Sequence, residues 1–275
     1  MMLDSHQHFW QLSRGDYDWL TPELTPLYRD FLPEDLLPKL EASGVTETIL
    51  VQAAATVAET EFMLSLAEQN DFISGVVGWV NFGEAVATAE IERLAAHSKL
   101  VGFRPMIQDI PDKDWMLRPQ NERAYQCLIE QNLVFDALVL PQHLKNLHTL
   151  ANRFPDLSVV IDHGAKPPIR EAIPDSWFHE MASLAEMPQI NCKVSGLVTE
   201  ASDNWKPEDL QSVIQHLLSS FGPERLLWGS DWPVLEMAGT YEQWFGVART
   251  AFADLPESEQ AAIFGNNARR IYLKR

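Results

Sequence analysis

Short apolar segments alternate along the chain with longer stretches in which apolar residues recur every three or four positions. The short segments predict eight strands, at residues 3–8, 48–52, 73–80, 100–104, 133–139, 158–163, 190–195 and 226–231. The stretches between them predict helices: Pro33 and Gly44 bracket one apolar stripe, and Pro207 and Gly222 bracket another. The chain is thus predicted to contain eight consecutive strand–helix units.

Several predicted strands, such as LSVVID and ISGVVGWV, are apolar almost throughout, which is typical of strands buried on both faces. Eight such units predict an α/β fold of the (β/α)8 TIM-barrel type, with residues 1–275 as a single domain. A doubly wound open sheet is the alternative, but no glycine-rich phosphate-binding turn follows the first strand.

The composition narrows the function classes. The 275 residues are 46% hydrophobic, which excludes a disordered chain, and 21 basic against 39 acidic residues give a net charge of −18. Such acidity disfavours binding to nucleic acid or to an anionic membrane surface. The start, MMLDSHQHFW, has no signal-peptide pattern, and no apolar run could span a bilayer. We therefore expect a cytoplasmic protein whose two cysteines are reduced.

Two histidines stand at the end of the first predicted strand. Because side chains two apart in a strand project to the same face, His6 and His8 should both point into the barrel, with Asp4 on the same face one step deeper. A His-x-His pair is a good arrangement for a divalent metal, although two hydrogen-bonded core histidines would have the same spacing. The position at a strand's carboxyl end favours a functional site.

Three further strand ends carry polar side chains. The fourth strand ends in VGFRP with Arg104, the sixth in IDHGAKP with His163 and Lys166, and the eighth in LLWGSDWP with Asp231. Each has a simpler explanation alone, since Asp231 could cap a turn and Arg104 could form an internal ion pair. Their occurrence together at the carboxyl ends of several units predicts one site at the mouth of the barrel.

Other side chains are candidates for the interior or the mouth. Lys193, on the seventh strand, would be an internal ammonium group, with Asp136 on the fifth strand as its expected partner. Gln52, at the end of the second strand, is a candidate for substrate contact, although it could only order the mouth. Apolar sugar faces stack on aromatic rings, so the same role is expected of four loop tryptophans: Trp10, Trp19, Trp115 and Trp232.

The chain resembles the lactone-hydrolysing branch of the amidohydrolase superfamily in segments that follow one another along nearly its whole length: DSHQHFW, GFRPMIQDIPDKDWMLRP, IDHGAKP, NCKVSGLVTEA, LLWGSDWPV and IFGNNARRIYL. The match is closest to the L-fuconolactonase and L-rhamnonolactonase group. This resemblance implies a distorted TIM barrel and the hydrolysis of a sugar-derived lactone to its aldonic acid. The implied site residues are His6, His8, His163 and Asp231.

One position departs from the binuclear members of the superfamily. These hold a carboxylated lysine or a glutamate at the end of strand four, where this chain has Arg104. A guanidinium group cannot bridge two metals, which disfavours a two-metal site. We expect that His6, His8 and Asp231 bind one divalent ion, with zinc favoured. Metal-independent activity stays open, because the resemblance is to a branch that includes enzymes with and without a metal.

The expected mechanism uses Asp231 as the general base for a water that attacks the lactone carbonyl. His163, with Lys166 or Arg104 nearby, would donate hydrogen bonds to the oxyanion. A metal, if bound, would act as a Lewis acid. The chain has no GxSxG elbow, which argues against a serine nucleophile.

Alternatives remain open at this point. A decarboxylase of the same fold would use the same histidines and aspartate, with Arg104 as a clamp for the substrate carboxylate. A lactonase for a pyrone dicarboxylate should have several cations at the mouth, and the chain offers Arg104, Lys166 and Arg118. A barrel kept only for binding is disfavoured by the converging titratable side chains. The expected partner is a small molecule, and homo-oligomerisation stays open.

Overall fold

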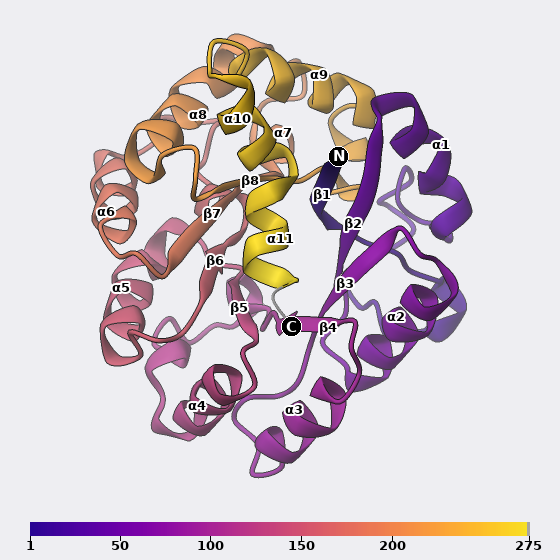
Figure 1. Cartoon of the computed structure of the whole chain (residues 1–275), viewed down its shortest axis with the longest axis vertical. Coiled ribbons are helices and arrows are strands. Elements are labelled where there is room, and N and C mark those ends of the chain that lie inside the picture. Colours follow the sequence, from indigo (N-terminus) through magenta and orange to yellow (C-terminus); the bar gives the residue numbers. More distant parts are fainter. Residues whose placement is uncertain (274–275) are drawn as a thin grey trace.

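Within residues 1–273, the part of the chain that the computed structural model describes, eight strands follow one another around a barrel (Figure 1). Each strand pairs in parallel with the next one in the chain. The strands are β1 (Met2–Gln7), β2 (Val45–Val51), β3 (Ile73–Gly78), β4 (Leu100–Phe103), β5 (Val134–Ala137), β6 (Val159–Ile161), β7 (Ile190–Val194) and β8 (Leu226–Trp228). The predicted TIM barrel is confirmed, and every predicted strand overlaps an observed one.

Helices alternate with the strands, and most of them cover the outside of the barrel (Figure 1). They are α1 (Pro33–Ser43), α2 (Val57–Gln69), α3 (Ala87–Ala95), α4 (Glu122–Glu130), α5 (Leu144–Arg153), α6 (Asp175–Ala185), α7 (Leu197–Glu200), α8 (Pro207–Phe221), α9 (Tyr241–Ala251), α10 (Glu257–Ala261) and α11 (Asn267–Tyr272). The bracketing residues act as predicted, since Pro33 and Pro207 begin helices and Gly44 ends α1. No helix within residues 1–273 is long and apolar enough to cross a bilayer.

β1 and β8 meet at their carboxyl ends and close the barrel. A parallel bridge joins Gln7 to Trp232, and the backbone N–H of His8 donates to the Trp232 carbonyl at 2.7 Å. The N–H of Asp231 donates to the His6 carbonyl at 2.8 Å. The alternative of an open, doubly wound sheet is therefore wrong, and the closure places the candidate residues of the first and last strands side by side.

Apolar side chains form two layers. The larger, outer layer lies between the strands and the surrounding helices. The inner layer fills the barrel: Leu3, Ile49, Val51, Val77, Val101, Val134, Val160, Leu227, Ala268, Ile271 and Tyr272. Among the described residues, β7 adds no apolar side chain to this inner layer, and the fully buried Lys193 lies there instead.

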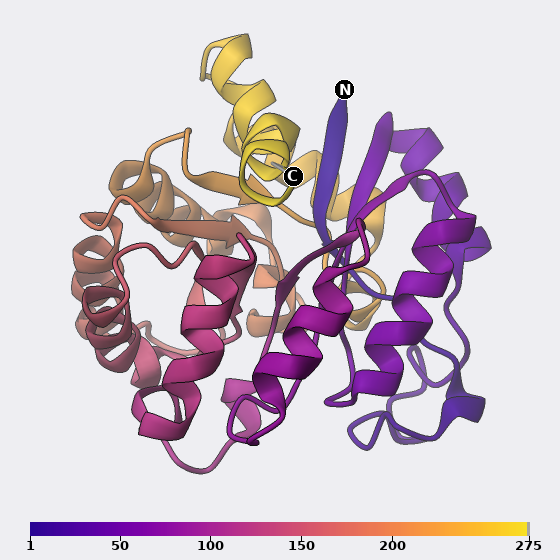
Figure 2. The ribbon, with the colours of Figure 1, turned by 60° about the horizontal axis from the view of Figure 1, so that its bottom comes forward.

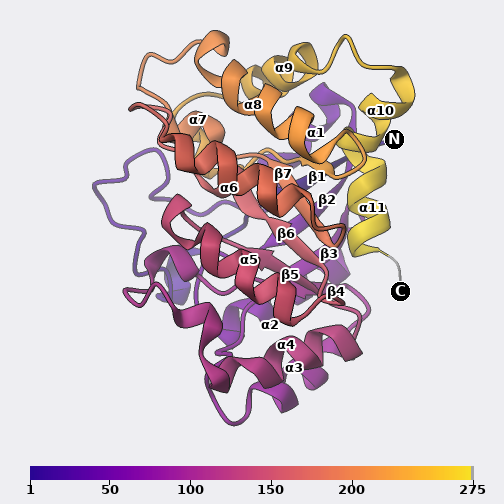
Figure 3. The same ribbon diagram turned by 90° about the vertical axis from the view of Figure 1, so that its left-hand side faces the viewer.

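The two ends of the barrel differ. α10 and α11 lie at the end where the chain begins (Figures 2 and 3), and α11 crosses the barrel in the view of Figure 1. Three residues of α11 join the inner apolar layer, so this helix plugs the amino end. The loop of residues 9–32 after β1 lies at the opposite end, which leaves the carboxyl ends of the strands to form a site.

The path of β1 contains one irregularity that affects a predicted site residue. Its pairing with β2 shifts register within residues 4–7, as in a β-bulge. Leu3 and His6 both point into the barrel. In a regular strand two residues separated by three positions would point to opposite faces. Asp4 consequently points outward, where its carboxylate accepts from the Tyr241 hydroxyl of α9 at 3.1 Å. The prediction that Asp4 shares a face with His6 is wrong, because strict alternation fails across a bulge.

Candidate active site

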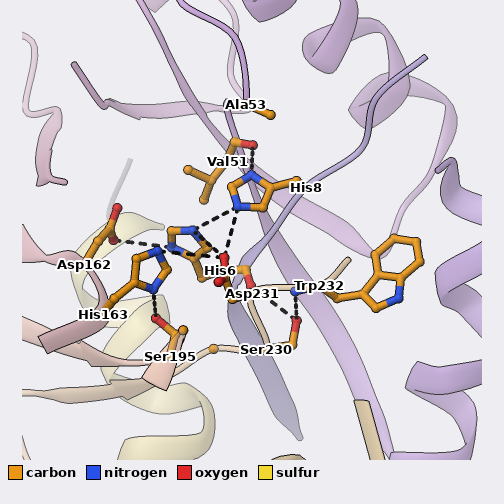
Figure 4. A network of polar contacts seen from close by, with 12 residues as sticks. His6, His8, Val51, Ala53, Asp162, His163, Ser195, Ser230, Asp231 and Trp232 are labelled. Atoms are coloured by element: carbon orange, nitrogen blue, oxygen red, sulfur yellow. Dashed lines mark hydrogen bonds and ion pairs between the residues drawn. The ribbon is translucent and has the colours of Figure 1, made fainter. Parts of the chain in front are cut away.

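Four side chains from three strand ends meet at the carboxyl end of the barrel (Figure 4): His6, His8, His163 and Asp231. The Nε2 atoms of His6 and His8 lie 3.2 Å apart. The Oδ1 atom of Asp231 lies 3.3 Å from Nε2 of His8, 3.6 Å from Nε2 of His6 and 3.8 Å from Nε2 of His163. The structure thus brings together the four residues that sequence patterns assigned to these strand ends.

His163 reaches this cluster through an irregular turn after β6. Val160 points into the barrel, so alternation along the strand directs Asp162 inward and His163 outward. A left-handed backbone at His163, with φ of 56°, followed by Ala165 with φ of 61°, turns the imidazole back to the cluster. Asp231 is left-handed as well, with φ of 60°. Such residues cost about 1 kcal/mol or more each and gather at functional sites.

Two glycines leave room for the imidazoles. A Cβ atom on Gly229, just after β8, would lie 2.7 Å from the Cβ of His6. A Cβ atom on Gly196 would overlap the imidazole of His163. Real side chains essentially never approach so closely, so both positions require glycine for the observed packing.

Asp162, which is not among the predicted site residues, is fully buried next to the histidines (Figure 4). Its Oδ1 lies 3.3 Å from Nδ1 of His6 and 3.0 Å from Nζ of Lys193, and its Oδ2 accepts from Arg104 at 3.4 Å. A carboxylate on the Nδ1 side of an imidazole orients the ring and leaves Nε2 free to bind. The signal that could have found Asp162 is the two-residue alternation from Val160.

The expected partnership between Lys193 and Asp136 is confirmed. The Lys193 Nζ donates to Oδ2 of Asp136 at 2.5 Å, and both side chains are fully buried. Asp136 also accepts from the Tyr272 hydroxyl at 2.7 Å. Charges inside a barrel are tolerated only when they are paired in this way.

Burial and neighbouring groups set the charge of the cluster. Burial alone would raise the pKa of Asp231, but His163 and the hydrogen bond from His8 hold that pKa below its usual range. Burial lowers the pKa of His163 to about 4, and it lowers that of His6 well below its ordinary value. At neutral pH the cluster therefore contains the ionised carboxylate of Asp231 beside the neutral imidazoles of His6 and His163, a state that can accept a proton or bind a metal.

The donor atoms fit a metal ion. Ligands bound tetrahedrally to zinc lie about 3.3 Å from one another. The measured donor pairs in the cluster are 3.2–3.8 Å apart. Donor atoms of His6, His163 and Asp231 all lie within 4.8 Å of each other, and His8 adds a further imidazole at 3.2 Å from His6. The predicted set His6, His8 and Asp231 is thus gathered, with His163 as an additional donor.

The buried charges also favour a single added cation. The buried network contains three carboxyl groups and two cations. The carboxyl groups belong to Asp136, Asp162 and Asp231, and the cations are Lys193 and Arg104. Arg104 lies after β4, with its Nη1 3.4 Å from Nε2 of His6. Its guanidinium group cannot act as a metal ligand.

A cavity of about 230 Å³ opens beside the cluster. It is lined by His8, Trp19, Ala53, Arg104, Met106, Gln108, Asp109, Leu138, His163, Lys166, Asp231 and Val234. Two of the predicted substrate contacts, Arg104 and Lys166, therefore lie on its wall. A larger groove of about 650 Å³ between α8 and α9 contains no residue of the cluster.

Three predicted tryptophan contacts do not line this cavity. Trp10 and Trp232 are fully buried, and each packs edge-on against Phe31. Trp115 is 8% exposed and lies beside a neighbouring hollow. The aromatic rings of the loop pack against one another, because burying them removes a large apolar area from water.

Gln52 also differs from its predicted role as a substrate contact. It is fully buried and does not reach the cavity wall. Its side-chain Nε2 donates to the backbone carbonyl of Arg104 at 2.7 Å, and its backbone carbonyl accepts from the Arg104 guanidinium group. The structure therefore shows that Gln52 orders Arg104. This agrees with the alternative role for Gln52, which was to order the mouth of the barrel.

Trp19 supplies the aromatic ring on the cavity wall. Its Nε1 donates to the Ala53 carbonyl at 2.8 Å. The carboxyl group of Glu59, on α2, accepts from the N–H groups of Ala53 at 3.0 Å and of Ala54 at 2.7 Å. The fully buried carboxyl group of Glu59 thus fixes the backbone segment to which Trp19 is hydrogen-bonded.

The chain is similar to known proteins over nearly its whole length. An L-fucono-1,5-lactonase of Burkholderia ambifaria is 40% identical over 274 residues, which cover 98% of this chain and 94% of that protein. An L-fucono-1,5-lactonase of Burkholderia multivorans is 36% identical over 286 residues, which cover 99% and 96%. A crystal structure of an amidohydrolase from Burkholderia multivorans with bound zinc has a TM-score of 0.93 at 34% identity and covers 99% of both chains.

The amidohydrolase family profile matches residues 3–274. This match and the two relatives above 30% identity agree with the barrel and with the cluster at its carboxyl end. The chain therefore belongs to the amidohydrolase family.

Proposed function

We propose that the protein hydrolyses a sugar-derived aldonolactone, of the L-fuconolactone or L-rhamnonolactone type, to its aldonic acid. The observation that carries this proposal is Asp231, a buried and ionised carboxylate that lines the cavity and faces three imidazoles. The names of the two Burkholderia relatives support the substrate class.

Asp231 serves as the general base in this proposal. It takes a proton from a water molecule as the water oxygen attacks the lactone carbonyl carbon. The carbonyl oxygen carries the negative charge until the bond between the carbonyl carbon and the ring oxygen breaks. Asp231 returns the proton to the ring oxygen, and the product is the open-chain aldonic acid.

His163 and Arg104 are the proposed donors to the developing oxyanion, because both line the cavity beside Asp231. Lys166 lies at the rim, where its Nζ donates to Gln108 at 3.0 Å and lies 3.4 Å from Glu200. We assign Lys166 to the hydroxyl groups of the substrate, since an ammonium group held by neighbours is an oriented donor.

We further propose that His6, His8 and Asp231 hold one zinc ion. The spacing of the donor atoms supports this set, and the zinc in the Burkholderia multivorans structure supports the identity of the metal. When bound, such an ion would supply Lewis-acid polarisation of the carbonyl and of the attacking water. Asp162 and Lys193 lie on the Nδ1 side of His6, which leaves the Nε2 side of the ring facing the other proposed ligands.

The cavity favours a neutral lactone over the anionic alternatives. A pyrone dicarboxylate or an aromatic acid would bring one or two carboxylates. Of the two cations on the wall, Lys166 lies near Glu200 and Arg104 near Asp162. Since both positive charges are already compensated, neither is a strong site for a substrate carboxylate.

The replacement Asp231→Asn tests the function. It keeps the shape of the side chain but removes the base, so we expect turnover of aldonolactones to fall by at least about a hundredfold. A pH-indicator assay with a panel of aldonolactones measures this, because each hydrolysis releases a proton. The control is Asp156→Asn, which changes the same charge at an exposed position. Near-wild-type turnover by Asp231→Asn would make the assignment of the base wrong.

Removal of metal tests the zinc proposal. We expect elemental analysis of the purified protein to find about one zinc per chain, and dialysis against a chelator to lower both zinc content and turnover together. Added zinc should restore both. Full turnover in a preparation without detectable metal would instead leave His6 and His8 as ligands of the substrate.

A further inference from the structure

A second hollow, of about 260 Å³, lies beside the cavity of the cluster. It is lined by residues that follow β3 and β4, so it belongs to the carboxyl end of the barrel, as the cluster does. Met106 and Asp109 line both spaces, which makes the hollow a side extension of the cavity. None of the four cluster residues lines it, and the proposed hydrolysis of a monosaccharide lactone makes no use of it.

The walls of the hollow are mostly apolar and aromatic. Trp79 and Phe82 come from the segment after β3, and Met106 and Trp115 come from the loop after β4. The ring of Trp115 packs at a tilt against that of Phe82, with ring centres 6.1 Å apart. The backbone N–H of Trp79 donates to the Thr60 hydroxyl of α2 at 2.8 Å, and this hydroxyl lies 3.2 Å from the Trp79 carbonyl. These contacts hold the aromatic walls in place.

The two tryptophans that line the hollow have indole N–H groups with no acceptor among residues 1–273. Six of the nine tryptophans in the chain donate this group to another residue. The indole nitrogen of Trp228 is enclosed in the core without a partner, whereas those of Trp79 and Trp115 are not enclosed. Trp115 is only 8% exposed and Trp79 is half-buried. Since a buried indole N–H normally has a partner, these two free donors indicate a ligand.

Asp109 supplies an acceptor where the two spaces join. Within the described part of the chain, its carboxyl oxygens accept only from the Gln108 amide, at 3.3 and 3.4 Å. Lys166 donates to Oε1 of Gln108 at 3.0 Å, so the NH₂ end of that amide is turned toward Asp109. Both contacts of the Asp109 carboxyl group are long, which leaves its oxygens able to accept from the hydroxyl groups of a ligand.

These groups suit a sugar ring better than other classes of ligand. A sugar presents C–H groups that stack on tryptophan, and hydroxyl groups that pair with both donors and acceptors. An acyl chain would cover the two indole N–H groups and leave them unpaired, which weakens binding. An anionic group would meet the carboxyl group of Asp109 without a compensating cation, since none of the described residues that line the hollow is lysine or arginine.

We propose that the hollow is a subsite for a second, non-reacting sugar unit. The lactone ring occupies the cavity beside Asp231, and a glycosyl group attached to it stacks on Trp79 and Trp115. Only the ester bond of the lactone is cleaved, and the glycosidic bond stays intact. The substrate class thereby extends to the lactones of oxidised disaccharides. The kinetic test of this inference rests on the proposed lactone hydrolysis, whereas the binding test does not.

The kinetic test compares L-fucono-1,5-lactone with three derivatives that carry a β-D-galactosyl group on O2, O3 or O4. Galactose has one ring face made of C–H groups, which suits a stacking site. We expect kcat/KM of at least one derivative to exceed that of the parent lactone by at least about tenfold, because contacts with a remote part of the substrate lower the barrier of the reaction. If all three derivatives fall short of this ratio, the hollow is not a sugar subsite.

Trp79→Ala removes one wall of the hollow, so the ratio of kcat/KM between the best derivative and the parent lactone should fall to about one. Trp205→Ala is the matched control, because Trp205 is 8% exposed, as Trp115 is, and lines neither space. The control should keep the wild-type ratio. If a variant of this pair does not fold, Trp79→Phe and Trp205→Phe take their place, and the loss of the N–H in Trp79→Phe should lower the ratio by at least about threefold. An unchanged ratio at position 79, or an equal fall at both positions, would contradict the proposal.

The binding test requires no hydrolysis. The corresponding galactosyl-L-fucose disaccharides contain no ester bond, and nitrogen–proton correlation spectra report the indole N–H of each tryptophan. We expect at least one disaccharide to move the signals of Trp79 and Trp115, assigned with Trp79→Phe and Trp115→Phe, while L-fucose alone leaves them in place. If these signals move but no aldonolactone is hydrolysed, the proposed function is wrong and the subsite stands. Signals that stay in place with all three disaccharides would overturn the subsite, whatever the activity.

Discussion

At the scale of single residues, side chains reach the site through different backbone conformations. Asp162 follows the alternation of β6 and lies inside the barrel, where sequence periodicity could have placed it. His163 breaks that alternation and needs a left-handed backbone to join the cluster. A two-residue period carries no information about such a turn, and the location of His163 beside Asp231 follows instead from its position at a strand end.

Glu59 is a residue whose protonation couples to stability. Burial raises its pKa to about 8, with the hydrogen bonds from Ala54 and Ala53 acting in the opposite direction. Between pH 4.5 and about 8, the folded protein keeps a proton that the unfolded chain releases. The favourable contribution of the protonated group is therefore fully present below pH 4.5 and is lost as the pH rises through about 8.

We predict that Glu59→Gln flattens this pH dependence. The free energy of unfolding should fall less between pH 5 and pH 9 in the variant than in the wild type, by a difference on the order of 2–4 kcal/mol. Urea unfolding at the two pH values measures it. Glu61→Gln, at an exposed position on the same helix, should behave like the wild type. Parallel pH curves for the wild type and Glu59→Gln would contradict the assigned pKa.

At the scale of elements, strand ends and not strand interiors position the chemistry. The bulge in β1 reverses the direction of His6 relative to Leu3, and the bridge to Trp232 brings Asp231 beside it. The close contact of the two strand ends depends on Gly229, which has no side chain to separate them.

We predict that Gly229→Ala lowers lactone turnover by at least about tenfold, because the new methyl group would lie 2.7 Å from the Cβ of His6 and displace it. Stability should fall by about 1–3 kcal/mol, as in an overpacked core. Gly246→Ala, inside α9 with no atom within 4 Å of its added Cβ, should instead keep activity and gain up to about 1 kcal/mol. Steady-state kinetics and urea unfolding of both variants check this, and full activity of Gly229→Ala would contradict it.

At the scale of the whole molecule, the start of β1 and the closing helix α11 lie together at the amino end of the barrel. Arg269 of α11 pairs with Glu47 of β2 and donates to the Met1 carbonyl at 3.1 Å. Since the first strand, the last strand and the closing helix contact one another, we propose that residues 1–275 form a single domain.

Most of the net charge of −18 comes from residues outside the site. Inside the barrel, buried carboxylates and cations nearly balance, and Arg104 and Lys166 line the cavity. A neutral lactone can approach a negatively charged protein without an electrostatic penalty, and the acid that forms is mildly repelled.

Sequence by itself determined the eight strand–helix units, the barrel, the Lys193–Asp136 pair and the strand ends that carry the cluster. Periodicity, caps and turn residues express preferences of neighbours in the chain, and these were enough. Tertiary structure alone decided that Asp4 faces outward, that Trp10 and Trp232 are core residues, and that Tyr272 reaches Asp136. These outcomes depend on register shifts and on contacts between residues far apart in the chain, which no local pattern encodes.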